Sequence, residues 1–554
     1  MNYKELISKL INNSLVTEND ITLAAEGHGD FALPCFKYAR ELRKAPQIIA
    51  SDFASGLTKC DFIDHVEAVG GYLNFYLSRK ARIESVLADC ENKSSVNAVR
   101  AVNAGKTVCI DYSSINIAKP FHIGHLMSTA IGGSLYRIYK YLGWNAVGIN
   151  HLGDWGTQFG KLLAAYNEWG DKSRPLTLND MLSLYVRFTE ESEKNPQLAE
   201  RGRTEFLKIE RGEADAVKTY ELFKETTLAE VNKVYDRLGI VFDSYNGEAF
   251  YNDKMQPIID ELNAKSLTEV SDGALVVKLD DYGMPPCLIT RSDGATLYAT
   301  RDLSAANYRA ETYKFDKSLY VVATQQNLHF KQVFKVLELM GREWAKDLTH
   351  VQFGMVSYEG KPLSTRHGHV VFLADVIENT VKKALDIINE KNPDLEDKAQ
   401  TAESVGVGAV MFFALGTQRI KDVDFNYDKV LSFDGETAPY IQYTRARCQS
   451  VLAKGGEIGD VDYSLLASDE SYAVIKLLDN FNTTVIDSAE KYEPSIIARY
   501  LIDLAQAFNK FYIAGRIITD DKPLTNARLA LTKAVADTLK TGLSLLLINS
   551  PDKM

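Results

Sequence analysis

The sequence lacks long hydrophobic runs, paired cysteines and internal repeats. No stretch approaches the roughly 18 consecutive apolar residues that span a membrane, and the start Met1-Asn2-Tyr3-Lys4-Glu5 lacks the basic and apolar segments of an export signal. Six cysteines are scattered without a Cys-x-x-Cys pair, which argues against a zinc site and favours reduced thiols. We therefore expect a cytoplasmic protein that does not contact a membrane.

The composition is that of a folded protein with several domains. The 554 residues are 45% hydrophobic and 25% charged, which excludes disordered and collagen-like chains. The 63 Lys and Arg against 74 Asp and Glu give a net charge of −11. This net negative charge does not indicate a polyanionic partner. A local basic groove can still bind nucleic acid, because only the charges that meet phosphates release counterions.

Three regions follow from the hydrophobic patterns. Residues 1–100 mix a helical stretch at 46–56 with a strand-like run at 71–77, which predicts an α+β domain, and the polar stretch 91–97 is typical of a linker. Residues 376–554 show apolar spacing of helical period, including 474–478, 498–504 and 529–547. This pattern predicts an all-α domain at the end of the chain.

The middle region, 101–375, predicts a doubly wound α/β fold. A strand at 107–113, a helix at 123–142 that stops at Gly143, and a strand at 146–150 form one strand–helix–strand unit. A second unit comprises a strand at 318–323, a helix at 328–340 and a strand at 351–356. Two such halves make a Rossmann-like parallel sheet. The charged, helix-rich stretch at about 170–280 is then an insertion between them.

The strongest local motif is His122-Ile-Gly-His125, where the first strand of this region gives way to a helix. Ligands bind outside the carboxyl ends of parallel strands, and a helix N-terminus offers N–H groups to phosphate. The two imidazoles could donate hydrogen bonds to phosphate oxygens, Gly124 lets a flat base approach, and Lys119 adds a cation. The alternative, a metal pair, requires further ligands, and none is evident nearby.

This motif resembles the signature of class I aminoacyl-tRNA synthetases. Other segments resemble the arginyl-tRNA synthetase branch in particular: 113–119, 150–160, 298–302, 320–329, 354–356 and 439–443. The resemblance covers most of the chain. It implies an arginine–tRNA ligase that joins L-arginine to ATP, releases pyrophosphate, and passes the arginyl group to the terminal ribose of tRNA(Arg). It also implies Mg²⁺ that accompanies ATP without a dedicated protein site, and a monomer.

The second family signature corresponds to Lys361-Pro-Leu-Ser-Thr-Arg-His-Gly368. The resemblance assigns catalytic roles to Lys361, Ser364 and Arg366 beside His122, His125 and Lys119. The chain departs from most class I members because Thr365-Arg366-His367 stands where they carry Ser-Lys, and Lys119 would replace the missing charge. Taken alone, the segment is as typical of a solvated turn.

The resemblance also implies the substrate contacts. The L-arginine site comprises Ser114, Ile115, Asn116 and His125 at the backbone end, Tyr298 and Gln326 beside it, and Asp302 and Glu248 at the guanidinium. The ATP site comprises His122, Gly124, His125, Gly153, Asp154 and Lys361. Carboxylates suit a forked guanidinium. Taken alone, Asp302 after Thr300-Arg301 is more often a helix cap.

Contacts with tRNA are expected in the first and third regions. Tyr443 would stack on a base, although core packing is an equal alternative, and Arg445, Arg447 and Lys454 would meet phosphates. Met554, at the end of the chain, falls where the family approaches the anticodon. In the first region the candidate contacts are Phe31, Lys37 and Asn74.

Two other functions remain open at this stage. A cysteinyl member of class I would carry a zinc site with clustered Cys and His, whereas the cysteines here are dispersed. A non-catalytic, synthetase-like tRNA-binding protein would be expected to have lost the signature histidines or the arginine site, and both are present.

Overall fold

The computed structural model describes residues 3–25, 27–292, 294–362, 371–432 and 435–554. The chain divides into two compact units. One comprises Met1–Ala98, Thr444–Thr483 and Asp503–Lys540, and the other Val99–Tyr443, Thr484–Ile502 and Thr541–Met554. In the described part of the chain, no helix is long and apolar enough to cross a membrane.

The chain begins with the expected α+β region. Its sheet has the order β1-β2-β4-β3, and all three pairs are antiparallel. The elements are α1 (Tyr3–Ile11), β1 (Thr22–Leu23), β2 (Phe31–Pro34), α2 (Ala39–Leu42), α3 (Pro46–Gly56), β3 (Ile63–Val69) and β4 (Tyr72–Leu77). The helix expected at 46–56 and the strand expected at 71–77 are confirmed.

The linker expected at 91–97 is wrong. Helices α4 (Arg79–Asn92) and α5 (Ser94–Asn103) are separated only by Lys93, which has a left-handed backbone (φ 57°). The hydroxyl of Ser94 donates to a carboxylate oxygen of Asp89 (2.6 Å), and the Ser95 N–H donates to the same oxygen (2.7 Å). Polar residues here turn one helix into the next, because serine and aspartate satisfy the helix ends.

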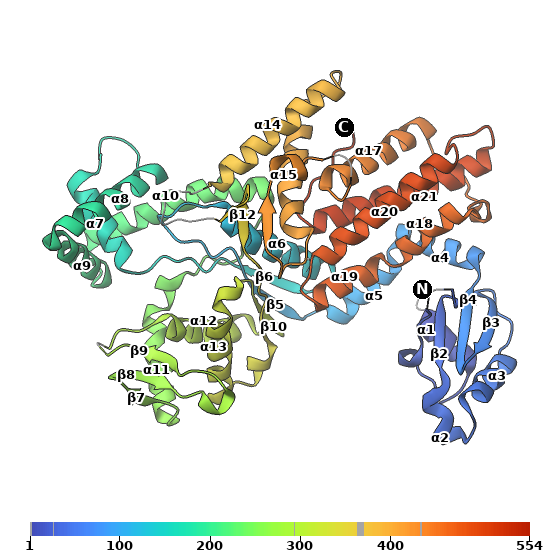
Figure 1. The fold of residues 1–554 in the computed structure, drawn as a ribbon, viewed down its shortest axis with the longest axis horizontal. Coiled ribbons are helices and arrows are strands. Elements are labelled where there is room, and N and C mark those ends of the chain that lie inside the picture. Colours follow the sequence, from blue (N-terminus) through green and yellow to red (C-terminus); the bar gives the residue numbers. More distant parts are fainter. Residues whose placement is uncertain (1–2, 26, 293, 363–370, 433–434) are drawn as a thin grey trace. The chain divides into compact units, whose positions relative to one another are not determined.

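The parallel sheet of the second unit has the order β11-β10-β5-β6, and all three strand pairs are parallel (Figure 1). These strands are β5 (Thr107–Asp111), β6 (Asn145–Ile149), β10 (Lys317–Tyr320) and β11 (Leu348–His350). All five residues of β5 are buried, the polar Thr107 and Asp111 among them, as in a strand covered on both faces of a parallel sheet. Chain order reverses between β5 and β10, so their carboxyl ends are the expected ligand edge.

Two helices follow the central strands of this sheet. β5 leads through a 3₁₀ turn, η3 (Ile123–His125), into α6 (Leu126–Tyr141), and β10 leads through η6 (Thr324–Gln326) into α13 (Asn327–Leu339). Gly132 of α6 has no room for a side chain, because a Cβ would lie 2.2 Å from the Cβ of Tyr112. This close approach brings α6 onto the end of β5.

The insertion is helical only in part. Helix α7 (Thr157–Trp169) precedes it, and the helices within it are α8 (Leu178–Lys194), α9 (Pro196–Glu210), α10 (Ala214–Leu238) and α11 (Met255–Ala264). They are followed by an antiparallel sheet of β7 (Glu269–Ser271), β8 (Ala274–Val277) and β9 (Cys287–Thr290). Asp272 and Gly273 both have positive φ and form the two-residue turn between β7 and β8, a hairpin signal that helical periodicity overlooked.

The single strand expected at 351–356 is wrong. β11 ends at His350, and β12 (Val356–Tyr358) belongs to another sheet, β13-β12-β14, with β13 (Lys361–Pro362) and β14 (Val423–Phe425). The chain leaves the parallel sheet at Gly354, whose N–H donates to the Arg419 carbonyl (2.8 Å). A Cβ on Gly354 would lie 2.5 Å from the Lys421 carbonyl, so a side chain does not fit there.

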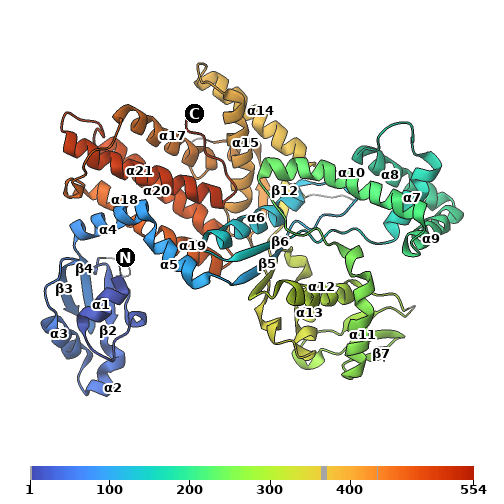
Figure 2. The same ribbon diagram turned by 180° about the vertical axis from the view of Figure 1, so that it is seen from behind.

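The last region is mostly helical. Its helices are α14 (Leu373–Lys391), α15 (Lys398–Leu415), α16 (Tyr427–Val430), α17 (Ala438–Gly455), α18 (Asp469–Asp479), α19 (Phe481–Glu490), α20 (Ser495–Ala514) and α21 (Lys522–Leu545) (Figure 2). The expectation of helix alone over 376–554 needs correction, because β14 pairs in parallel with β12. Backbone hydrogen bonding to a distant strand overrides the local pattern.

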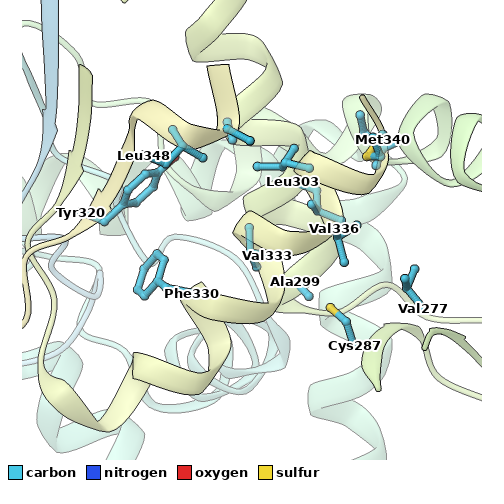
Figure 3. Packing of buried hydrophobic residues seen from close by; sticks show 14 of the residues in the cluster. Val277, Cys287, Ala299, Leu303, Tyr320, Phe330, Val333, Val336, Met340 and Leu348 are labelled. Atoms are coloured by element: carbon cyan, nitrogen blue, oxygen red, sulfur yellow. The ribbon is translucent and has the colours of Figure 1, made fainter. Parts of the chain in front are cut away.

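A hydrophobic core holds α12 (Tyr298–Tyr313) and α13 together beside the parallel sheet. Leu303 of α12 and Val336 of α13 are completely buried in it, along with Phe330 and Tyr320 (Figure 3). Apolar residues of β8 and β9 close the same cluster. This packing fixes the positions of α12 and α13, which carry polar residues of the expected ligand site.

Candidate active site

The loop after β5 has an unusual backbone. Ser113, Ser114 and Ala118 all have positive φ (68°, 45° and 57°), which non-glycine residues rarely adopt. The Ser113 N–H donates to the hydroxyl of Ser128 (2.9 Å), which in turn donates to the Val321 carbonyl (2.7 Å). Backbone strain of this kind persists where surrounding contacts hold it, and it clusters at ligand sites.

The two signature histidines lie together at the start of α6. The His122 N–H donates to Nδ1 of His125 (3.2 Å), and the Gly124 N–H donates to Nδ1 of His122 (3.1 Å). The ring centres are 4.0 Å apart. Because each Nδ1 accepts a backbone hydrogen, the proton of each neutral ring resides on Nε2. Each histidine thus presents one N–H donor at a helix N-terminus.

Both imidazoles are neutral at physiological pH. The pKa of His125 is lowered to about 3, mainly by burial and also by the nearby His122 and Lys119. Burial also lowers the pKa of His122. Neutral rings can donate through Nε2–H to phosphate oxygens, so they act here as hydrogen-bond donors rather than as charges.

Described residues on either side of the second signature lie beside the histidine motif. Ile123 N–H donates to the Val371 carbonyl (3.0 Å), Leu373 N–H donates to the Phe121 carbonyl (3.0 Å), and β12 contacts η3. Lys361 is exposed in β13, which pairs antiparallel with β12. Ser364 and Arg366 lie outside the described residues. The alternative of a solvated turn concerns residues 361–368, most of which lie outside the described part of the chain, and it stays a prediction.

The segment after β6 supports the β5 loop. Gly153 N–H donates to the Ile115 carbonyl (2.8 Å), and Ile117 N–H donates to the Gly153 carbonyl (3.1 Å). A Cβ on Gly153 would lie 2.4 Å from Oδ1 of Asn116, so glycine lets the two segments touch. Asp154 is fully buried, 2.9 Å from Nζ of Lys224, and accepts the Ala249 N–H (2.9 Å).

Asp302 lies inside α12, and the helix-cap interpretation is wrong. The helix begins at Tyr298, one full turn earlier, with Leu297 as its N-cap. Oδ2 of Asp302 lies 2.5 Å from Nε2 of His329, in the first turn of α13. Burial raises the pKa of Asp302, whereas the hydrogen bond from His329, with His151 and Arg309 nearby, lowers it, and the net pKa is below its ordinary value. Asp302 is therefore an ionised carboxylate near neutral pH.

Three other predicted residues stand at the same edge of the sheet. Glu248 opens the 3₁₀ segment η4 (Glu248–Lys254), with its carboxylate 3.5 Å from Arg301 of α12. Burial raises the pKa of Glu248 to about 7, against the lowering effect of Arg301. Tyr298 is exposed at the start of α12, and Gln326 is exposed immediately before α13.

Family comparisons agree with this geometry over the whole chain. Residues 84–427 match the model of the tRNA synthetases class I (R), catalytic domain. Residues 1–77 match the arginyl tRNA synthetase N terminal domain, and residues 441–554 match the DALR anticodon binding domain. The chain belongs to the arginyl-tRNA synthetase family.

Relatives and a solved structure of this family cover nearly the full length. An arginine–tRNA ligase of Alkaliphilus metalliredigens is 48% identical, over 95% of this chain and 94% of that protein. One from Clostridium botulinum (strain Alaska E43 / Type E3) is 47% identical over all of both chains. The arginyl-tRNA synthetase of Thermus thermophilus matches the fold with a TM-score of 0.83 at 27% identity, over 100% of this chain and 99% of that one.

The residues expected to contact tRNA have different environments. Tyr443 of α17 is 44% exposed, and Lys454 is exposed. Arg445 is only 2% exposed, which contradicts its assignment to a phosphate, because a buried guanidinium cannot reach one. Arg447 is partly buried, donates to Asn509, and lies 5.1 Å from the ring centre of Tyr512.

Two candidate contacts of the first region are wrong for the same reason. Phe31 is 9% exposed and Asn74 is 4% exposed, so both belong to the interior of the sheet. Lys37 pairs with Asp20 and keeps half of its side chain exposed. Met554 packs against the hydrophobic cluster of α14 and α15, and its carbonyl accepts from Asn392 (3.2 Å).

Sequence reasoning missed several polar residues of the site. His329 stands beside Asp302, Arg309 pairs with Asp111, and Lys224 pairs with Asp154. A signal for His329 was available, since it follows Gln326 by three residues and therefore shares its side of the helical turn. Arg309 and Lys224 gave no such signal, because their partners are more than 60 residues away.

Proposed function

We propose that the chain, an arginine–tRNA ligase by family, activates L-arginine with ATP at the carboxyl edge of the parallel sheet and then charges tRNA(Arg). The observation that carries this proposal is the combination of two neutral histidines at a helix N-terminus with two carboxylates from neighbouring elements. Lys119 influences the pKa of both His125 and Glu248, so the phosphate side and the amino-acid side are electrostatic neighbours.

The amino-acid side would hold arginine at both ends. Asp302 and Glu248 would receive the guanidinium, with Tyr298 and Gln326 beside them. Ser114, Ile115 and Asn116, in the loop supported by Gly153, would hold the backbone end. A carboxylate left buried without a cation is costly, so the site would reject amino acids that lack a forked cation.

The phosphate side would stabilise charge at the reacting phosphorus. In activation, a carboxylate oxygen of arginine attacks the α-phosphorus of ATP and the bond to pyrophosphate breaks. Nε2–H groups of His122 and His125 would donate to phosphate oxygens, while Gly124 would let the adenine approach. Lys119, Lys361 and Arg366 would balance the pyrophosphate charge and Ser364 would donate a hydrogen bond to it, with Mg²⁺ arriving on the triphosphate. Asp154, paired with Lys224, would support the ATP site through the Gly153 turn.

Transfer to tRNA would use the remaining regions. A ribose hydroxyl of the terminal nucleotide attacks the arginyl carbonyl, and AMP leaves. Exposed Tyr443 and Lys454 would contact the anticodon side, together with Arg447 and the end of the chain at Met554. We keep three domains in this proposal, with boundaries near residues 100 and 375, and we infer a cytoplasmic monomer.

ATP–pyrophosphate exchange tests this proposal. The assay is run with each of the twenty amino acids, with and without total tRNA. Among the twenty amino acids, we expect only arginine to support exchange. His122→Ala and His125→Ala should each reduce it by about 10²- to 10³-fold while tRNA binding persists. Silence with every amino acid in a protein that still binds tRNA would favour the non-catalytic alternative.

Asp302→Asn tests the guanidinium assignment. The amide keeps the shape of the carboxylate but loses its charge, so arginine activation should fall by at least about tenfold, the loss expected for a hydrogen bond to a charged group. Circular dichroism should show an unchanged fold. Near-normal arginine kinetics in this variant would contradict the assignment.

The proposed monomer is tested by light scattering, and a mass above 61.8 kDa would contradict it.

A further inference from the structure

His329 is placed to control the orientation of the Asp302 carboxylate. Its Nε2 lies 2.5 Å from Oδ2 of Asp302, and both side chains are about one-quarter exposed. The N–H of a neutral imidazole can donate to this oxygen, which fixes the plane of the carboxylate. A guanidinium fork requires a carboxylate in one defined plane, because it donates two parallel hydrogen bonds.

Both partners stand on rigid elements. Ala299 and Leu303 flank Asp302 on α12, and Phe330 and Val333 flank His329 on α13. All four are buried in one hydrophobic core (Figure 3). Because neither helix can shift without disturbing that core, the hydrogen bond between them has a fixed length and direction.

The chemical nature of this partner distinguishes Asp302 from the other carboxylates of the site. Asp111 pairs with Arg309 (2.7 Å), Asp154 pairs with Lys224 (2.9 Å), and Glu248 faces Arg301 (3.5 Å). Those partners are permanent cations, and Asp111 and Asp154 form close ion pairs with theirs. An imidazole can instead hold a carboxylate by a hydrogen bond and leave its negative charge for a substrate cation.

Several other ionisable groups influence Asp302 or are influenced by it. They come from β9, β10, α12, η4 and the segment after β6: Cys287, Tyr320, Arg309, Glu248 and His151. Among the hydrogen bonds of the described residues, the side-chain partner of Asp302 is His329. Removal of the His329 side chain should therefore change the orientation of Asp302 more than it changes these other groups.

We propose that His329 is a positioning residue that holds the Asp302 carboxylate in the plane that receives the arginine guanidinium, and that this hydrogen bond contributes to selectivity for arginine. The inference rests on the proposed function. It predicts that loss of His329 weakens arginine binding specifically, while the ATP side of the site keeps its properties.

Steady-state kinetics of His329→Ala and His329→Gln test the proposal. His329→Ala should raise KM for arginine by about 10- to 100-fold, the value of a hydrogen bond to a charged group. Its kcat at saturating arginine and its KM for ATP should stay within about threefold. Gln offers an amide donor to Asp302, so His329→Gln should recover most of the loss. The ratio of kcat/KM for arginine over lysine should fall in the alanine variant.

The controls separate the possible failures. His65→Ala changes a histidine of β3, far along the chain and about half exposed, and should leave every constant unchanged. A wild-type protein without arginine-dependent exchange would contradict the proposed function itself. An active wild type whose KM for arginine is unchanged in His329→Ala would overturn only the role of His329. Equal increases of KM for arginine in His329→Ala and His329→Gln, with lowered melting temperatures in both, would also overturn the role of His329.

Discussion

Asp111 at the end of β5 and Arg309 of α12 form a buried ion pair, with Oδ2 and Nη2 2.7 Å apart and the residues only 6% and 1% exposed. The same carboxylate accepts the hydroxyl of Ser114 (2.7 Å), and Arg309 also contacts Nδ1 of His151 (3.3 Å). One pair of charges thus joins the strained β5 loop to the helix that carries Asp302.

We expect Asp111→Asn to destabilise the protein strongly. It leaves the Arg309 guanidinium buried without a countercharge, which costs about 3–5 kcal/mol. Chemical denaturation measures the change. Glu230→Gln is a matched control, because its partner Lys233 lies at 2.7 Å on an exposed surface, and it should cost less than about 1 kcal/mol. The double variant Asp111→Leu with Arg309→Met should recover much of the lost stability. Equal destabilisation by Asp111→Asn and Glu230→Gln would contradict this prediction.

His125 should make stability depend on pH below neutrality. Its folded pKa of about 3 is below the value of about 6.5 for a free histidine, so between these pH values the unfolded chain binds a proton that the folded chain does not. Stability from this group is complete above pH 6.5 and falls as pH falls, by up to about 1.4 kcal/mol per pH unit. Comparing melting temperatures of the wild type and His125→Asn from pH 7.5 to 5.5 measures this, and parallel curves would refute it.

Glu248 should make arginine binding depend on pH near neutrality. Because burial raises its pKa to about 7, the carboxyl is partly protonated at pH 7, and a bound guanidinium favours the ionised form. Below pH 7 binding must release a proton, so KM for arginine should rise as pH falls, by at most about tenfold per unit. Above pH 8 this dependence disappears.

Two variants check the origin of that dependence. Glu248→Gln should bind arginine more weakly at pH 8 and lose the dependence between pH 6 and 8. Glu210→Gln is the control, because burial also raises the pKa of Glu210, on the insertion helix α9, and it should keep the wild-type profile. Calorimetry in buffers of different ionisation enthalpy counts the released proton. A pH profile that survives in Glu248→Gln would assign the effect to another group.

Leu337 and Leu328 of α13 offer a test of the core. Leu337 is completely buried, whereas Leu328 is 47% exposed on the same helix. Leu337→Ala should cost about 2–5 kcal/mol through lost burial and a new cavity, and Leu328→Ala should cost less than about 1 kcal/mol. Similar denaturation midpoints for the two variants would contradict the placement of α13 against the sheet.

Much of the fold followed from local patterns. The strand expected at 107–113, which the structure ends at Asp111, and the helix that follows it were predictable because apolar residues repeat at the spacing of buried elements. The break at Gly354 was not predictable, because the reason for it is the backbone of Lys421 approaching from another part of the chain. β14 escaped prediction for a similar reason, since its three residues are a strand only beside β12.

The sequence by itself determined the family, the signature histidines and the candidate carboxylates, because these depend on residue type, order and spacing. Only the tertiary structure decided which side chains are charged, paired or accessible. Burial makes His125 neutral and raises the pKa of Glu248, and it removes Arg445 from the surface. The pairing of Asp302 with His329 spans 27 positions. Such contacts depend on how separate helices pack on one sheet, and desolvation depends on the whole surroundings of a group.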